Sequence, residues 1–153
     1  MSFKQFNLNT QIEKGIEALG YTAPTPIQLQ SIPAILQGKE VMGMAQTGTG
    51  KTAAFALPIL QRLMSGPRRS LRALIVAPTR ELAEQIHEVI VSLAGRTRLR
   101  SVTIYGGVNI KPQIRSLRSG VEIVVACPGR LLDHISQRTI DLSHVEVLVL
   151  DEA

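Results

Sequence analysis

The sequence Ala45-Gln46-Thr47-Gly48-Thr49-Gly50-Lys51-Thr52 lies between an apolar run at residues 41–44 and a segment with helical spacing. This order predicts a strand, a glycine-rich turn and a helix. Gly48 and Gly50 allow backbone angles and close approaches that a Cβ would block. The N–H groups of such a turn and of the helix start suit a bound phosphate group. Ala45 stands where the usual pattern has glycine, and an ordinary glycine-rich turn is the alternative interpretation.

A second informative stretch lies at the far end, where the apolar run at 145–150 is followed by Asp151 and Glu152. In a triphosphate site, Lys51 would contact the β- and γ-phosphates and the Thr52 hydroxyl would ligate Mg²⁺. Asp151 would hold the same ion, and Glu152 would polarise the attacking water. Taken alone, this stretch could be a solvated acidic strand end. Its combination with residues 45–52 favours a site for a triphosphate and Mg²⁺.

Composition bounds the class of protein. With 153 residues and a hydrophobic fraction of 44%, the chain is long enough for one domain with a real core. No apolar run approaches the roughly 20 residues that a membrane span needs. Cys127 is the single cysteine, which excludes an internal disulfide framework and suits a reducing compartment. We therefore expect a cytoplasmic protein with no membrane partner.

Basic residues gather in two stretches that contain no acidic residue, between Glu40 and Glu81 and between Glu88 and Glu122. The net charge is +5. The stretches hold Lys51, Arg62, Arg68, Arg69, Arg72 and Arg80, and then Arg96, Arg98, Arg100, Lys111, Arg115 and Arg118. This clustering favours a polyanionic partner. An ordinary solvated basic face is the alternative.

Hydrophobic spacing and the positions of proline and glycine predict alternating strands and helices. We expect strands at 41–44, 74–77, 101–105, 121–126 and 145–150, and helices at about 10–19, 27–36, 51–64, 80–94, 110–117 and 130–136. Such alternation predicts an α/β fold with a mostly parallel central sheet and helices on both faces. Ligands bind at the carboxyl ends of such strands. The segments after Met44, Ala77, Tyr105, Ala126 and Leu150 should therefore share one rim.

Six short motifs occur in an order that resembles the DEAD-box ATP-dependent RNA helicases, particularly bacterial members. They are Pro-Thr-Pro-Ile-Gln (24–28), AQTGTGKT (45–52), PTRELA (78–83), Gly-Gly (106–107), Pro-Gly-Arg (128–130) and VLDEA (149–153). The resemblance implies a three-layer RecA-like P-loop domain, the first of two such domains, whose C-terminal strand or strands are missing here. It also implies ATP, Mg²⁺ and RNA as ligands. Within the chain it separates an adenine-recognition segment, 1–38, from an ATP-binding part, 39–153, in one structural domain.

Carried over by position, the resemblance assigns adenine recognition to Gln28 and base stacking to Phe3, with Tyr21 at the same end. The Gln28 amide can both accept from and donate to the adenine edge. A helix-surface glutamine and a docking hydrophobe are the alternatives for Gln28 and Phe3. Phe55 is expected in the core.

The same resemblance places RNA on three segments after strands. These comprise Pro78, Thr79 and Arg80, then Gly106 and Gly107, and then Pro128, Gly129 and Arg130. Bare glycines and helix N termini let backbone N–H groups approach phosphates, and the arginines add charge. A plain strand-to-helix turn is the alternative for each segment. Because aromatic residues are few, we expect sequence-independent backbone contacts. Cys127 stands where this family usually has threonine, and we expect it to be a buried, inert thiol.

His87, His134 and His144 have no ligand-spaced companions and are expected on surfaces or helix faces. The second RecA-like domain, which supplies arginine fingers in this family, is absent from these residues. We expect this chain to be a monomer that binds nucleotide without unwinding RNA. A non-catalytic, nucleotide-gated RNA-binding scaffold is the rival hypothesis, and another P-loop ATPase, such as a DNA helicase, is a weaker one.

Overall fold

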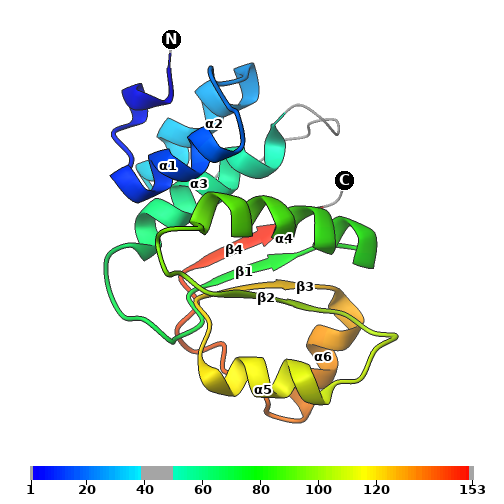
Figure 1. Cartoon of the computed structure of the whole chain (residues 1–153). Coiled ribbons are helices and arrows are strands. Elements are labelled where there is room, and N and C mark those ends of the chain that lie inside the picture. Colours follow the sequence, from blue (N-terminus) through cyan, green and yellow to red (C-terminus); the bar gives the residue numbers. More distant parts are fainter. Residues whose placement is uncertain (1, 39–49, 152–153) are drawn as a thin grey trace. The chain divides into compact units, whose positions relative to one another are not determined.

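The computed structural model describes residues 2–38 and 50–151. Figure 1 shows the whole chain. By its internal contacts it divides into two compact units, of which the first comprises Met1–Gly66, Val89–Arg98 and Ala153, and the second comprises Pro67–Glu88 and Leu99–Glu152. The predicted strand at 41–44, residues 45–49 of the glycine-rich turn, and Glu152 lie outside the described residues.

The first unit is helical over its described residues. It contains a 3₁₀ turn, η1 (Phe3–Phe6), and helices α1 (Thr10–Ala18), α2 (Pro26–Leu36) and α3 (Lys51–Leu63). The Asn9 side chain caps α1 by accepting from the Gln11 N–H at 2.9 Å, and the Asn9 N–H donates to Gln61 of α3 at 2.7 Å. The predicted helices are confirmed, whereas η1 was not predicted.

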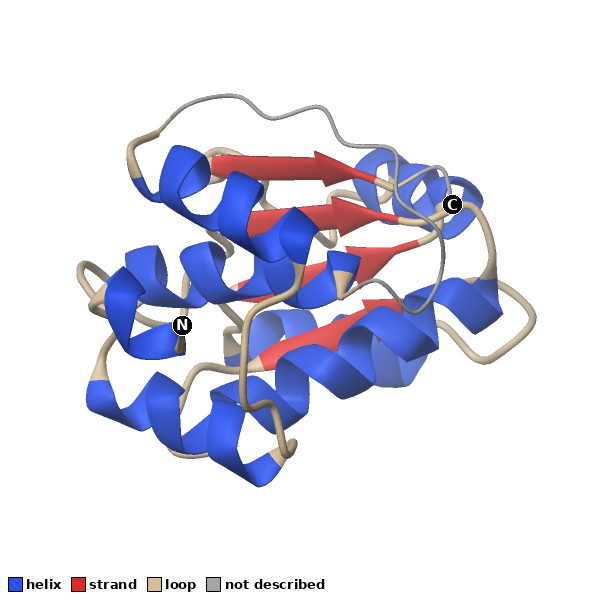
Figure 2. Cartoon of the chain, turned by 90° about the horizontal axis from the view of Figure 1, so that it is seen from above, coloured by secondary structure: helices blue, strands red, loops and turns tan. Residues whose placement is uncertain are grey.

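The second unit is built on a parallel sheet. Its strands are β1 (Ala73–Val76), β2 (Ser101–Ile104), β3 (Ile123–Ala126) and β4 (Val147–Leu150), in the order β2-β3-β1-β4. The four arrows in Figure 2 point in the same direction. The parallel sheet is confirmed, although β3 and β4 begin two residues later than predicted.

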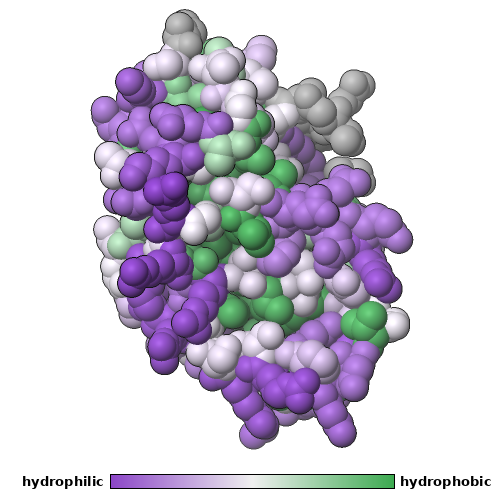
Figure 3. All heavy atoms as spheres, in the orientation of Figure 1, coloured by the Kyte–Doolittle hydropathy of each residue, from purple (hydrophilic) through white to green (hydrophobic). Residues whose placement is uncertain are grey.

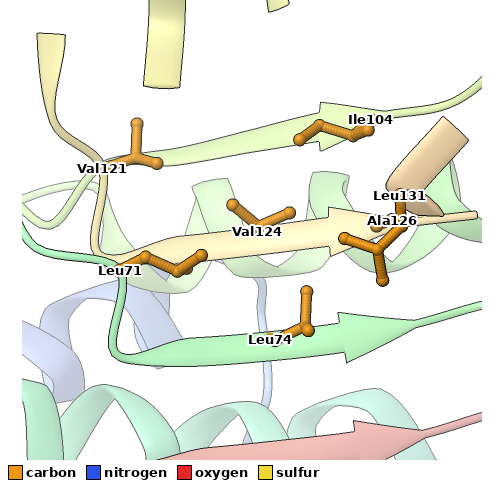
Figure 4. Packing of buried hydrophobic residues seen from close by; sticks show 7 residues of the cluster. All are labelled: Leu71, Leu74, Ile104, Val121, Val124, Ala126 and Leu131. Carbon is orange, nitrogen blue, oxygen red and sulfur yellow. The ribbon is translucent and has the colours of Figure 1, made fainter. Parts of the chain in front are cut away.

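Both faces of the inner strands are buried. Figure 4 shows the apolar cluster on one face, which joins the strands to α6 (Pro128–Ser136) and consists of Leu71, Leu74, Ile104, Val121, Val124, Ala126 and Leu131. On the other face, Ile75 and Val125 are also fully buried. Burial on both faces is typical of parallel strands and explains their continuous apolar sequences.

Helices accompany the sheet on both sides, as the alternation predicted. In Figure 1, α5 (Lys111–Ser119) and α6 lie below the sheet, and the opening turns of α4 (Arg80–Ala94) lie above it. Helix α4 runs from the second unit into the first. Among the described residues, no helix combines the length and apolar character that a membrane span requires.

Two charged residues are buried where the strands begin. Arg72 is 4% exposed and forms an ion pair with Glu146, which precedes β4. Arg72 therefore does not belong to the basic surface that the sequence suggested. Glu122 is 1% exposed, and its carboxylate accepts from the Arg69 and Arg100 N–H groups, each at 2.6 Å. One side chain thus connects the segments that lead into β1, β2 and β3.

Candidate nucleotide and nucleic-acid sites

The strands of the second unit end at the same level. Val76 is paired with Ala126 and with Leu150, and Ala126 is paired with Ile104. Hydrogen bonds continue one residue further, from the Asp151 N–H to the Val76 carbonyl at 2.9 Å and equivalently at the other strand ends. The segments that begin at 77, 105, 127 and 151 therefore leave the sheet along one rim. The shared rim is confirmed for these segments, and the segment after Met44 lies outside the described residues.

The segment after β1 lies beside the segment after β2. The Thr79 hydroxyl accepts from the Leu82 N–H at 3.2 Å, which caps the start of α4. The Arg80 guanidinium lies over the Tyr105 ring, 4.7 Å from its centroid, in a cation–π contact. Burial, followed by the side chain of Glu84, raises the pKa of Tyr105 above its ordinary value, so the ring remains neutral. The structure therefore joins two of the predicted RNA segments through Tyr105, to which the sequence assigned no role.

The glycines of the rim face open space. A Cβ built on Gly106, Gly107 or Gly129 would meet no heavy atom within 4 Å, and all three residues are exposed. Gly107 also has a φ of +82°, which favours glycine. Exposed backbone at Gly106 and Gly129 leaves room for a ligand to come close.

Arg130 is held by its own protein. Its guanidinium donates to the Val108 carbonyl at 3.0 Å and to the Gln113 side chain at 3.3 Å, and lies 3.5 Å from the Asp133 carboxylate. These contacts fasten the loop after β2 to α6. The geometry indicates a residue that positions the rim, whereas direct contact between Arg130 and RNA stays a prediction.

A buried polar pair lies behind Arg130. Gln113 donates to the Tyr105 carbonyl at 3.0 Å, and its side-chain oxygen lies 3.0 Å from His134 Nε2. His134 Nδ1 lies 2.7 Å from the Thr139 hydroxyl. His134 has no exposed surface, so of the two expected placements, a surface or a helix face, the structure shows the helix face, on the buried side of α6. Its place on the inner side of α6 becomes evident only when α5 packs beside it.

Acidification is expected to destabilise the chain through His134. Burial, and then the nearby Arg130 charge, lower the pKa of His134 below its ordinary value. The neutral ring therefore contributes stability that is complete above about pH 6.5 and is lost as the pH falls towards the folded-state pKa. We expect the free energy of unfolding, measured with urea from pH 7 to pH 5, to fall more steeply for the wild type than for His134→Gln. The slopes of unfolding free energy against pH in the wild type and in His134→Gln should differ by at most about 1.4 kcal/mol per pH unit, because one proton is involved. Equal slopes would contradict it.

The first unit contains Gln28, the residue assigned to adenine. Gln28 is 2% exposed, which excludes the helix-surface alternative. Its side-chain oxygen accepts from the Thr25 N–H at 2.9 Å, while its amide nitrogen donates to the Gly50 carbonyl at 3.1 Å. Thr25 and Gln28 also form a capping box at the start of α2. Counted over the described residues, these bonds leave one further donor and one further acceptor position on the amide.

Gly50 gives α3 its start. It has a φ of +81° and precedes Lys51 and Thr52, the first residues of the helix. A Cβ on Gly50 would lie 2.3 Å from the amide nitrogen of Gln28. The backbone immediately before Lys51 is therefore matched to the Gln28 side chain, a coupling that the sequence did not reveal.

Aromatic residues gather near the N terminus of the first unit. The Phe3 ring stacks on Tyr21, with centroids 6.2 Å apart, and meets Phe6 edge-on at 6.1 Å. Phe3 is 6% exposed. This burial supports a docking role for Phe3, and its contact with adenine stays a prediction. Phe55 is buried in α3, as expected.

Asp151 and Cys127 complete the predicted positions in the second unit. Asp151 is a buried carboxylate, 6% exposed, at the end of β4. Cys127 is half-buried, which is less than expected. Burial, and then the Glu81 charge, raise its thiol pKa, so it remains protonated and a poor nucleophile.

Comparison with known proteins agrees with this arrangement. The family model described as DEAD/DEAH box helicase matches residues 25–153. The chain belongs to this family. The DEAD/DEAH box assignment agrees with the order of the motifs along the chain and with the fold class expected from the sequence.

Individual relatives extend the likeness over nearly the whole chain. It is 49% identical over 151 residues to an ATP-dependent RNA helicase CshA from Listeria monocytogenes, covering 99% of this chain and 29% of that protein. A CshA from Limosilactobacillus reuteri is 46% identical and is covered to 31% of its length. The crystal structure of a hypothetical ATP-dependent RNA helicase from Sulfolobus tokodaii superposes with a TM-score of 0.86 at 42% identity, over 95% of this chain and 41% of that one. The chain thus spans less than a third of the curated relatives' length.

Proposed function

We propose that this chain is the ATP-binding part of an ATP-dependent RNA helicase, which hydrolyses ATP while separating short RNA duplexes. The observation that carries the proposal is the rim of the second unit, where the strands end at one level and the segments after β2 and β3 contain exposed glycines. Family membership supports ATP as the nucleotide. The relatives' greater length supports a second RecA-like domain in the complete protein.

Roles follow for the nucleotide side. Gln28 recognises adenine with its remaining hydrogen-bonding capacity, assisted by Phe3 and Tyr21. Residues 45–50 surround the phosphates with backbone N–H groups, and Lys51 supplies positive charge. The Thr52 hydroxyl and the Asp151 carboxylate are hard oxygen donors of the kind that Mg²⁺ binds. Mg²⁺ held by Thr52 and Asp151 would supply charge neutralisation at the phosphates, and Glu152 would orient the attacking water.

Roles also follow for RNA. Exposed backbone at Gly106, Gly107 and Gly129 allows close approach of RNA phosphates, and Thr79 and Arg80 extend this surface. Pro78 and Pro128 set the entry of their segments into α4 and α6. Arg130 holds the surface in shape through Val108 and Gln113. Because these contacts reach the backbone rather than base edges, we expect binding without sequence preference. We expect the protein to be cytoplasmic. The isolated chain is expected to be a monomer that binds nucleotide without unwinding RNA.

Replacing Gly129 with alanine tests the RNA surface without disturbing the fold. The added Cβ meets nothing within 4 Å, and alanine favours the start of α6. We expect Gly129→Ala to bind single-stranded RNA about tenfold more weakly, because the Cβ blocks one charge-assisted contact with a phosphate. The measurement is fluorescence anisotropy with a labelled oligonucleotide at fixed salt concentration. Gly106→Ala should behave alike.

The matched control is Gly95→Ala. Gly95 is also exposed and follows α4 in the first unit. A Cβ built on Gly95 would lie 3.5 Å from the Ser92 carbonyl oxygen, which is an ordinary contact. RNA affinity should be unchanged in this variant. If Gly106→Ala and Gly129→Ala both bound RNA as the wild type does, the proposed surface would be wrong.

A further inference from the structure

A hollow lies at the amino-terminal ends of the strands in the second unit, opposite the rim at their carboxyl ends. Its volume is about 270 Å³. It is lined by parts of the segments 69–71, 117–121 and 138–144, which lead into β1, β3 and β4. Because the strands are parallel, these segments mark the amino-terminal ends, whereas the proposed RNA surface follows the carboxyl ends. We call this feature the amino-end hollow.

The amino-end hollow has an excess of positive charge. Arg69, Arg118 and Arg138 line it, together with the imidazole of His144. The one carboxylate in the lining belongs to Asp141. It accepts from the Ser143 N–H at 2.9 Å and from the Ser143 hydroxyl at 2.6 Å. In Figure 3, hydrophilic side chains cover much of the left side, which includes the level at which Figure 1 draws the amino-terminal ends of the strands.

The protein holds two of these arginines in defined backbone positions. Arg69 and Arg138 have φ values of +63° and +56°, which are uncommon for residues other than glycine. The Arg69 N–H is bound by buried Glu122. Its backbone lies against Gly120, where an added Cβ would come within 2.9 Å of the Arg69 carbonyl oxygen. The Arg138 N–H donates to the Ile135 carbonyl at 3.1 Å. The defined backbone at Arg69 and Arg138 reduces the part of the ordering cost of binding that comes from the main chain.

We propose that the amino-end hollow binds a phosphate group. Guanidinium groups present planar, paired donors that match phosphate oxygens. Apolar side chains such as Leu117 and Ile140 also line the hollow. The phosphate belongs either to a small phosphorylated molecule or to an RNA backbone that passes this edge. The site is independent of the proposed function, since its residues are separate from those of the rim.

Arg118 and Arg115 provide a matched test. Both are exposed residues of α5, but only Arg118 lines the hollow. In the 153-residue chain, the arginine Nε–Hε signals are followed by NMR during titration with inorganic phosphate, with sodium chloride at equal ionic strength as reference. We expect saturable shifts for the lining arginines. We also expect Arg118→Gln to weaken phosphate binding about tenfold and Arg115→Gln to leave it unchanged.

A second arm identifies the source of the phosphate. If Arg118→Gln weakens binding of a single-stranded RNA oligonucleotide as well, the site serves an RNA backbone. If RNA affinity is unchanged while phosphate affinity falls, the ligand is a small phosphorylated molecule. Equal phosphate affinities in both variants, or shifts that chloride reproduces, would overturn the proposal. Failure of the Gly129→Ala experiment would not affect these outcomes, because Gly129 follows the carboxyl end of β3 and does not line the hollow.

Discussion

Gly50→Ala is expected to lower the affinity of the chain for adenosine nucleotides at least tenfold and to reduce its stability. The left-handed backbone at Gly50 costs about 1–2 kcal/mol when a Cβ is present. The Cβ would also collide with the Gln28 amide nitrogen. Gln28 must then move, which breaks its bond to the Gly50 carbonyl and displaces the group that we assign to adenine. Fluorescent ADP and GDP titrations, together with thermal unfolding, measure the two effects.

Gly38→Ala is the control that separates backbone strain from collision. Gly38 has a φ of +80° in the same unit, yet a Cβ there would meet nothing within 4 Å. It should lose stability through strain alone and keep its nucleotide affinity. In Gly50→Ala combined with Gln28→Ala, the collision is removed, so the stability lost should be less than the sum of the single losses. Wild-type ADP affinity in Gly50→Ala would contradict the assigned role of this contact.

Glu122→Gln is expected to lower the free energy of unfolding by about 3 kcal/mol, since buried N–H groups would lose a charged acceptor. The wild-type carboxylate accepts the Arg69 and Arg100 N–H groups with separate oxygens. In glutamine one oxygen becomes an NH₂ group, which cannot accept and faces a donor. Urea denaturation of the wild type and the variant at pH 7 measures the loss.

Two further substitutions sharpen that prediction. Glu122→Asp keeps both oxygens but shortens their reach, so an intermediate loss is expected. Glu88→Gln removes the same charge from an exposed position on α4 and should change stability little. If the urea midpoint of Glu122→Gln equalled that of the wild type, the hydrogen bonds between Glu122 and the segments before β1 and β2 would not stabilise the fold.

Most elements could be predicted from local signals. Helix start and stop signals depend on only a few neighbouring residues. Examples are Asn9 before α1, Pro26 at the start of α2, and Gly95 after α4. The apolar runs predicted strands that are buried on both faces, and the structure agrees. The boundaries of β3 and β4 were less certain, because the first apolar residues of those runs lie outside the strands.

Parts of the site could not be predicted, because they depend on residues far apart in the chain. Gln28 and Gly50 are 22 positions apart, as are Arg130 and Val108. The sequence around His134 does not predict its burial, which depends on Gln113 of α5 lying against its ring. The contact between Arg80 and Tyr105 likewise requires β1 and β2 to end at one level.

The sequence by itself determined the alternation of strands and helices, the family, and which short segments follow strands, because each depends on neighbouring residues. The tertiary structure alone decided the strand order, the burial of Gln28, Glu122 and His134, and the gathering of arginines at the amino-end hollow. The physical reason is that register and burial arise from contacts between distant segments. A polar side chain is stable in the interior only where such segments supply its hydrogen-bond partners.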